Sequence, residues 1–165
     1  MAEPEVQVLL EGLPGNLTPE TLSEIARRTV EKVFEIERAR GGMVEFPENP
    51  EVSVTFVGDD DIRDLNLQYL GKDEPTDVLA FSMRESAEGE PEVVGGPPED
   101  MLGDVVVSVE TAERQAYEYG QTLEAEVALL VAHGVLHLLG YDDCEPGRAA
   151  VMEEAQRRVL VELGY

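Results

Sequence analysis

The run that most constrains the fold is VALLVAHGVLHLL, residues 127–139, in which His133 and His137 are the only polar side chains. A helix that is apolar on all sides is a buried helix, so this run predicts one at the centre of the core. Residues four positions apart share a helix face. Both imidazoles therefore project from one stripe of a core helix, and the rest of the chain must fold around it.

A buried neutral imidazole needs a hydrogen bond or a metal. Two histidines at this spacing, with another ligand nearby, favour a zinc site over two hydrogen-bonded core histidines. Gly140 fits the left-handed position just past a helix end, from which the chain can turn back toward the histidines. Asp143 is the favoured third ligand, because two imidazoles, one carboxylate and a water suit a catalytic zinc. Cys144 is the competitor and would better suit a closed structural site.

Length and composition predict one folded domain. The chain has 165 residues, of which 42% are hydrophobic and 29% charged, so a single core is expected over residues 1–165. No apolar run reaches the roughly 20 residues that a membrane helix needs. The N-terminus does not resemble a signal peptide, and Cys144 is the single cysteine. A cytoplasmic protein with no membrane partner is therefore expected.

The charge is strongly acidic, with 36 acidic and 12 basic residues and a formal net charge of −24. Such a chain repels polyanions at long range, which argues against bulk nucleic-acid binding. A local basic or metal-centred site can still face an RNA, because bound cations offset the field. Residues 85–102 are rich in Glu, Gly and Pro and predict a mobile acidic loop.

The periodicity of the remaining segments predicts an alternation of strands and helices. Strands are expected at 5–11, 52–57, 78–83 and 103–109, and helices at 18–41, at 59–70 and from 111 onward. The fold class is therefore α+β, with one mixed sheet of about four strands and about five helices in a single domain. The metal site lies at the end of the buried helix.

Three blocks of the sequence carry a resemblance to a known family. They are PTDVLAF at 75–81, LGDVVVS at 102–108 and HGVLHLLGYD at 133–142. Together they resemble, in the expected order, the signature stretches of the YbeY family of metal-dependent endoribonucleases. The resemblance implies a single-strand-specific endoribonuclease that matures the 3′ end of small-subunit ribosomal RNA and takes part in ribosome quality control. Implied partners are ribosomal RNA and small-subunit ribosomal proteins, with no role for DNA.

The resemblance also implies one Zn²⁺ per chain, held by His133, His137 and Asp143, which activates a water for attack on a phosphodiester. The family has a histidine where this chain has Asp143. A carboxylate can replace an imidazole on zinc, so the site is expected to persist with altered charge and metal preference.

Two further departures concern the substrate side of the site. Leu70 stands where the family has an arginine, and Ala80 where it has a serine. The arginine would supply a fixed positive charge for a phosphate. Lys72, Arg63 and Arg84 are the candidates to replace that charge, each with the alternative of being an ordinary surface cation.

Supporting roles and alternative functions also follow from single residues. Thr76, Asp77 and Asp104 are candidates to orient ligands, although roles as turn and strand-cap residues are favoured over this one. Gly134 occupies the place of the catalytic Glu in His-Glu-x-x-His proteases, so a metalloprotease-like hydrolase ranks second. A non-catalytic, metal-stabilised ribosome-assembly module is the third hypothesis, favoured by the changes at Leu70 and Ala80.

Overall fold

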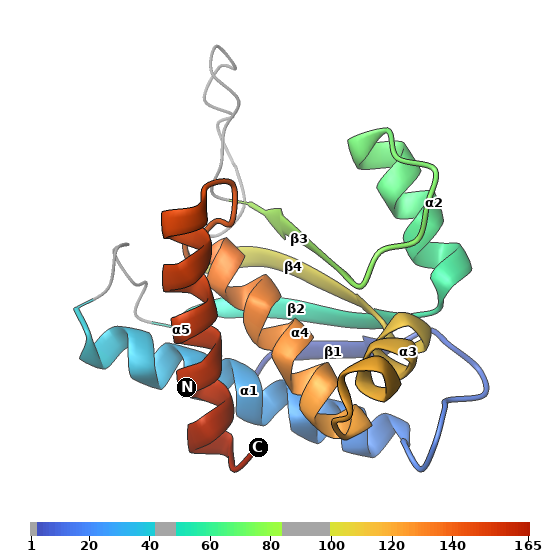
Figure 1. Cartoon of the computed structure of the whole chain (residues 1–165), viewed down its shortest axis with the longest axis horizontal. Coiled ribbons are helices and arrows are strands. Elements are labelled where there is room, and N and C mark those ends of the chain that lie inside the picture. Colours follow the sequence, from blue (N-terminus) through green and yellow to red (C-terminus); the bar gives the residue numbers. More distant parts are fainter. Residues whose placement is uncertain (1–2, 42–48, 84–99) are drawn as a thin grey trace.

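The computed structural model describes residues 3–41, 49–83 and 100–165. The elements follow the predicted order (Figure 1). The strands are β1 (Glu5–Val8), β2 (Glu51–Val57), β3 (Val78–Ser82) and β4 (Met101–Ser108). The helices are α1 (Pro19–Ala39), α2 (Asp59–Leu70), α3 (Val109–Tyr119), α4 (Leu123–Leu138) and α5 (Pro146–Leu163).

The four strands form one mixed sheet in the order β1-β2-β4-β3. Strands β1, β2 and β4 run parallel, and β3 lies antiparallel to β4 at one edge. The predicted α+β domain with a mixed sheet of four strands and five helices is therefore confirmed over the described ranges.

The expected boundary before β4 is wrong by two residues. The strand begins at Met101, which pairs with Glu51, and the amide of Glu51 donates to the carbonyl of Asp100 across 2.7 Å. Leu102 is fully buried. The acidic loop predicted for 85–102 therefore ends before Met101, and its residues 85–99 lie outside the part of the chain that the structure describes.

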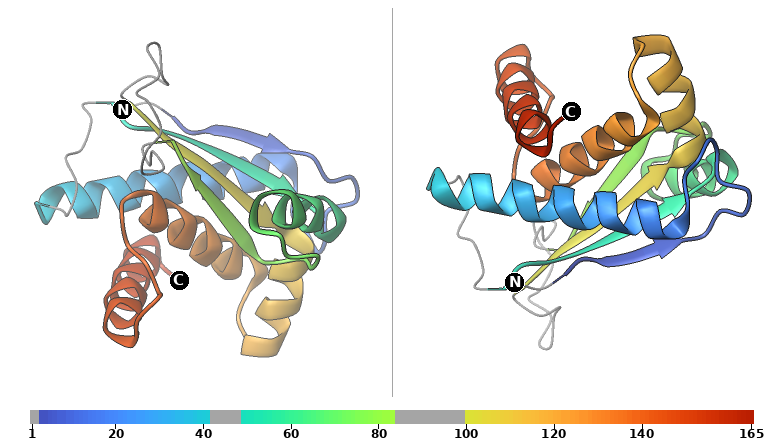
Figure 2. Two further views of the ribbon diagram at one scale, coloured as in Figure 1. Left: turned by 90° about the horizontal axis from the view of Figure 1, so that it is seen from above. Right: turned by 90° about the horizontal axis from the view of Figure 1, so that it is seen from below.

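The main core lies between the sheet and a layer of helices. Helices α1 and α4 lie side by side against one face of the sheet, and α5 packs against both of them (Figure 2). Alternate strand residues such as Val54, Phe56, Val105 and Val107 point into this layer. Helix α4 is buried on most of its surface, as its uninterrupted apolar sequence predicts.

Helix α2 covers part of the opposite face of the sheet. Ile62 of this helix packs with Val57, Leu79 and Val106, which form a second, smaller apolar cluster. Strands β2 and β4 are therefore buried on both faces near their carboxyl ends. No helix in the described ranges is long and apolar enough to cross a membrane.

Asp59 joins the beginning of α2 to the beginning of α3. Its carboxylate accepts hydrogen bonds from the hydroxyl groups of Ser108 (2.7 Å) and Thr111 (2.6 Å) and from the guanidinium of Arg114 (2.7 Å). Burial alone would raise the pKa of Asp59, but these hydrogen bonds outweigh it and hold the pKa below its usual value. The network holds both helices at the carboxyl end of the sheet.

Candidate metal centre

Two imidazoles meet on the outward face of α4. The Nε2 atoms of His133 and His137 lie 3.1 Å apart, and the rings stand edge to face with their centroids 4.6 Å apart. Both side chains are half-buried, although the residues around them on the helix are buried. The predicted stripe of two histidines on the core helix is therefore present, with its ring nitrogens turned toward one another.

The end of α4 turns the chain back toward these rings. The amide of Gly140 donates to the carbonyl of His137 (3.0 Å) and the amide of Tyr141 to that of Leu136 (3.1 Å), which together form a Schellman motif. Gly140 has a φ of +100°, the left-handed conformation predicted for it. The turn brings Asp143 to the histidines, and one ligand atom from each of the three residues lies within 4.8 Å of the others.

Asp143, and not Cys144, is the residue that joins the histidines. Among the described residues, the cluster able to hold a metal consists of His133, His137 and Asp143. Cys144 is exposed, and its amide donates to the side chain of Asp142 (3.2 Å). The geometry therefore favours a carboxylate as the third donor, which is the combination found in catalytic zinc sites.

Each histidine also has a partner outside the cluster. The Nδ1 of His133 is hydrogen-bonded to the amide oxygen of Gln156 on α5, and the ring of His137 to the backbone of Tyr141. Burial and the neighbouring His133 lower the pKa of His137, partly offset by Asp143 and by that backbone bond. The hydroxyl of Tyr141 in turn donates to the buried carboxylate of Glu37 (2.8 Å). These contacts connect the group of His133, His137 and Asp143 to α5 and α1.

Sequence reasoning missed Gln156, although the sequence carried a signal. Met152, Ala155 and Val159 form the buried stripe of α5, and Gln156 lies on the same face, four residues after Met152. A long amide side chain in an apolar stripe needs a hydrogen-bonding partner. The partner itself could not be read from the sequence, because it depends on how α5 packs against α4.

A pocket of about 270 Å³ opens beside the two histidines. One wall is the edge strand β3, with Val78 and Ala80, and Leu70 at the end of α2 closes another side. The histidines and Gly134 line the opposite wall. Leu70 and Ala80, two of the three positions at which this chain departs from the expected signature, therefore line the same pocket as the histidines.

Gly134 lies where α4 approaches strand β4 closely. A Cβ atom at this position would lie 2.5 Å and 3.0 Å from the two γ-methyl groups of Val105, and 3.3 Å from its Cβ. The position is buried against β4, facing away from solvent. The chain therefore lacks, at this position, the glutamate that serves as general base in His-Glu-x-x-His proteases.

Comparisons with known proteins match this arrangement to one family. The family model described as Endoribonuclease YbeY matches residues 16–164. The chain belongs to the YbeY family. The match confirms the predicted family, and the name of the family agrees with the predicted endoribonuclease activity.

Relatives named Endoribonuclease YbeY are similar over most of their length. The protein of Pelotomaculum thermopropionicum is 45% identical over 154 residues, which cover 93% of this chain and 94% of the relative. That of Geobacillus thermodenitrificans is 39% identical over 142 residues, covering 86% and 91%. The solution structure of TM1509 from Thermotoga maritima aligns with a TM-score of 0.59 at 30% identity, covering 96% of this chain and 87% of that one.

The supporting residues expected from the YbeY signature fall in different places. Asp77 caps β3: its carboxylate accepts from the amide of Val78 (2.8 Å) and from the hydroxyl of Thr76 (3.4 Å). It also lines a small pocket together with His133. Asp104 lines a groove on the opposite face of the sheet, so the structure does not bring it to the metal cluster.

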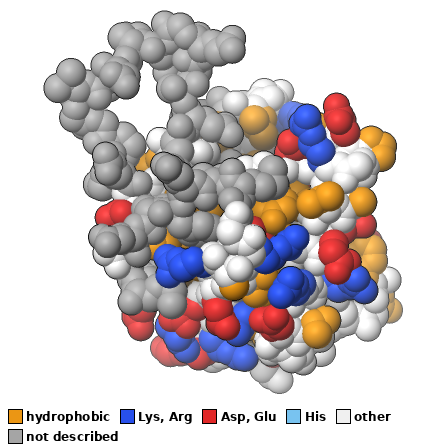
Figure 3. Space-filling view, turned by 90° about the vertical axis from the view of Figure 1, so that its left-hand side faces the viewer, with side chains coloured by type: hydrophobic (Ala, Val, Ile, Leu, Met, Phe, Trp, Pro, Cys, Tyr) orange, Lys and Arg blue, Asp and Glu red, His pale blue; other side chains and the backbone are white. Residues whose placement is uncertain are grey.

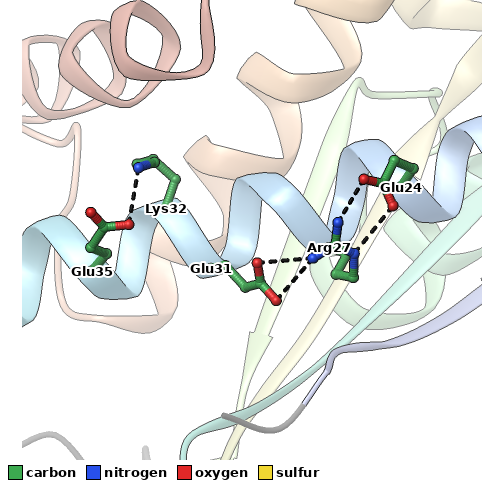
Figure 4. A network of polar contacts seen from close by, with 5 residues as sticks. All are labelled: Glu24, Arg27, Glu31, Lys32 and Glu35. Carbon is green, nitrogen blue, oxygen red and sulfur yellow. Dashed lines mark hydrogen bonds and ion pairs between the residues drawn. The ribbon is translucent and has the colours of Figure 1, made fainter.

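Most cations of this YbeY chain are held in ion pairs. Arg27 on α1 is bound by Glu24 and Glu31 on either side, and Lys32 by Glu35 (Figure 4). On the face shown in Figure 3, Lys and Arg side chains lie interspersed with Asp and Glu and form no continuous basic patch. The described residues visible on that face therefore form no broad basic surface for RNA.

Three cations are candidates to replace the missing arginine, and they differ in whether an acidic side chain already binds them. Arg63 forms an ion pair with Asp73 (2.8 Å). Arg84 lies outside the described residues. Lys72 is exposed in the loop after α2 and forms no ion pair with any acidic group in the ranges that the structure describes. Of the two that the structure describes, Lys72 is the one whose charge is not taken up by an ion pair.

Proposed function

We propose that this chain is a zinc-dependent endoribonuclease that cleaves single-stranded ribosomal RNA, at the 3′ end of the small-subunit RNA, in the cytoplasm. Its roles in rRNA maturation and ribosome quality control, and its small-subunit protein partners, belong to the same proposal. The observation that carries it is the convergence of His133, His137 and Asp143 within 4.8 Å beside a pocket, in a member of the YbeY family.

The donor set fits one Zn²⁺ per chain. Two imidazole nitrogens and one carboxylate oxygen are common ligands of catalytic zinc, which keeps a fourth position for water or substrate. The separation of 3.1 Å between the two Nε2 atoms suits two ligands of one ion. When bound, zinc would supply a nucleophilic water at neutral pH and polarise a phosphoryl oxygen.

The protein's own residues orient the substrate and the ligands. The histidines line the pocket and face each other through their Nε2 atoms, and Asp143 contributes the negative charge that favours a bound cation. The pocket of about 270 Å³ suits a nucleotide-sized group. A preference for unpaired RNA belongs to this proposal, because an unpaired strand can splay a nucleotide into a pocket of this size.

The missing arginine is compensated in part by Lys72. The lysine stands two residues after Leu70, which closes the pocket, and its ammonium group is exposed. Lysine binds a phosphate as a mobile point charge, without the planar fork of arginine. We therefore expect weaker phosphate positioning than an arginine would give. Basic small-subunit proteins would supply the remaining attraction between this acidic chain and the RNA.

The first test measures metal content. Protein purified without added metal or chelator is analysed for elements beside Asp143→Ala and the matched control Asp142→Ala. About one zinc per chain is expected in the wild type and in the control, with most of it lost from Asp143→Ala. Equal loss from both aspartate variants, or loss from Cys144→Ser instead, would overturn the ligand assignment.

The second test measures RNA cleavage. A single-stranded RNA with the small-subunit 3′ end is incubated with metal-replete wild type and with His137→Ala, whose fold is checked by circular dichroism. Cleavage should stop in the variant, and a duplex of the same sequence should resist the wild type. Cleavage that survives His137→Ala would refute the proposal.

The non-catalytic assembly module is the second candidate, and Leu70 favours it because the pocket lacks the family's arginine. It predicts RNA or ribosome binding without turnover. Comparing metal-replete with metal-free protein separates the two candidates, since only a metal-dependent enzyme turns over RNA faster when the metal is present.

A further inference from the structure

Gln156 contacts the metal cluster from a helix that contributes no ligand. It lies on α5, and its amide oxygen is hydrogen-bonded to the Nδ1 of His133. The side chain is half-buried and lines a pocket of about 170 Å³ behind the cluster, together with Asp77, Gln115 and Glu126. The proposed function assigns it no role.

The contact determines which nitrogen of His133 carries the proton. A neutral imidazole has one N–H donor and one nitrogen with a free lone pair. The amide oxygen of Gln156 can only accept, so this contact favours the tautomer with the proton on Nδ1. The lone pair is then on Nε2, the atom that faces His137 across 3.1 Å.

We propose that Gln156 is a positioning residue that holds His133 in its Nδ1–H tautomer and directs Nε2 toward the centre shared with His137 and Asp143. The expected effect of Gln156 on metal binding rests on the proposed function, because it requires that the three residues bind a metal. The effect of Gln156 on the tautomer of His133 does not depend on the proposed function. Without this bond the ring could rotate or carry its proton on Nε2. In either case the lone pair would no longer point to the cluster.

A neutral amide also suits the charge of the surroundings. Asp77 and the buried Glu126 already line the small pocket behind His133, and Asp143 is on the other side of the ring. A carboxylate at position 156 would add another acid in this low-dielectric space, where like charges repel more strongly than in water. The amide provides the acceptor without that repulsion.

The first experiment reads the tautomer in metal-free protein. Ring ¹⁵N shifts of His133 are recorded by NMR at alkaline pH, where imidazoles are neutral. Wild type should show the Nδ1–H form, and Gln156→Glu should keep it because a carboxylate also accepts. Gln156→Leu should lose it. A control, Arg157→Leu, places the same leucine at the next, exposed position and should change nothing. Unchanged shifts in Gln156→Leu, or an Nε2–H form in the wild type, would overturn the assignment.

The second experiment measures zinc affinity by competition with a chromophoric chelator. Loss of a hydrogen bond to a metal-binding histidine typically lowers affinity about 10- to 100-fold. We expect a decrease of that size in Gln156→Leu, largely restored in Gln156→Glu and absent in Arg157→Leu. Equal affinities in Gln156→Leu and wild type would refute the positioning role. If the wild type binds no zinc while the tautomer behaves as expected, the proposed function fails and the orienting contact stands.

Discussion

Substitution of Gly134 by alanine should loosen the packing of α4 on the sheet. The added Cβ would stand 2.5 Å and 3.0 Å from the two γ-methyl groups of Val105, where carbon atoms normally approach to about 3.5–4.0 Å. Val105 is fully buried and β-branched, so rotating its side chain does not clear both methyl groups. The helix must therefore move away from β4.

The expected magnitude is the difference between two opposing effects. Overpacking of a core costs about 1–3 kcal/mol, whereas replacing glycine by alanine within a helix gains about 1 kcal/mol. Because two methyl groups are in conflict, we expect a net loss of about 1–2 kcal/mol in the free energy of unfolding. His133 precedes Gly134 in the chain, so the displacement should also weaken metal binding.

Urea unfolding followed by circular dichroism measures the change, and Gly147→Ala is the matched control. Gly147 lies in the first turn of α5, and a Cβ there would meet nothing within 4 Å. This control should be stabilised by up to about 1 kcal/mol. The double variant Gly134→Ala, Val105→Ala relieves the clash and should cost less than the sum of its two single changes. A stabilised Gly134→Ala, or strict additivity in the double variant, would refute the steric reasoning.

Four further predictions concern other parts of the molecule. Asp59→Asn should lower the free energy of unfolding by about 1–2 kcal/mol at neutral pH. Because the pKa of Asp59 is lower in the folded than in the unfolded protein, the ionised carboxylate of the wild type stabilises the fold above the unfolded pKa of about 3.9. This contribution disappears as the pH falls through the folded pKa. A difference from wild type that persists at still lower pH in urea unfolding would contradict it. Burial raises the pKa of Tyr141 to about 12, so its hydroxyl remains a donor to Glu37 at physiological pH. Tyr141→Phe should therefore lower the free energy of unfolding by about 1–3 kcal/mol, measured by thermal or urea unfolding. An unchanged stability would show that the hydrogen bond contributes nothing. Asp143→His should shift the ratio of zinc to manganese affinity toward zinc, on the order of tenfold in competition titrations, because imidazole suits zinc and carboxylate suits manganese; an unchanged ratio would mean that the residue is not a ligand. Finally, kcat/KM for RNA should rise with moderate salt, since screening weakens the repulsion from a chain of net charge −24; a steep fall with salt would reveal a basic RNA-binding surface.

The sequence was sufficient to predict the centre of the fold. An apolar run with two histidines four residues apart required a buried helix with both rings on one side, and α4 has this form. Gly140 marked the turn that brings Asp143 back to the rings. These features are local, because helix periodicity and left-handed glycine conformations depend on neighbouring residues in the chain.

Features that depend on packing were harder to predict. The residues Val105, Val106 and Val107 of β4 do not alternate with polar residues, because α2 buries the second face of the sheet as well. Without alternation, the sequence did not reveal which way Asp104 points, and the structure places it in the groove on the far face. Gln156 is similar: its contact with His133 spans 23 positions in the chain and exists only once α5 is docked on α4.

The distribution of charge determines where this chain could attract an RNA phosphate. Arg27 on α1, Arg63 on α2 and Arg114 on α3 are each paired with an acidic neighbour, so these three cations present little free positive charge. A cation held by His133, His137 and Asp143 would then be a concentrated positive charge beside the pocket, with the ammonium group of Lys72 in the loop after Leu70. An RNA phosphate would be attracted at short range and repelled at longer range. Under the proposed function, such a chain would therefore favour RNA that a basic partner holds in place over free RNA.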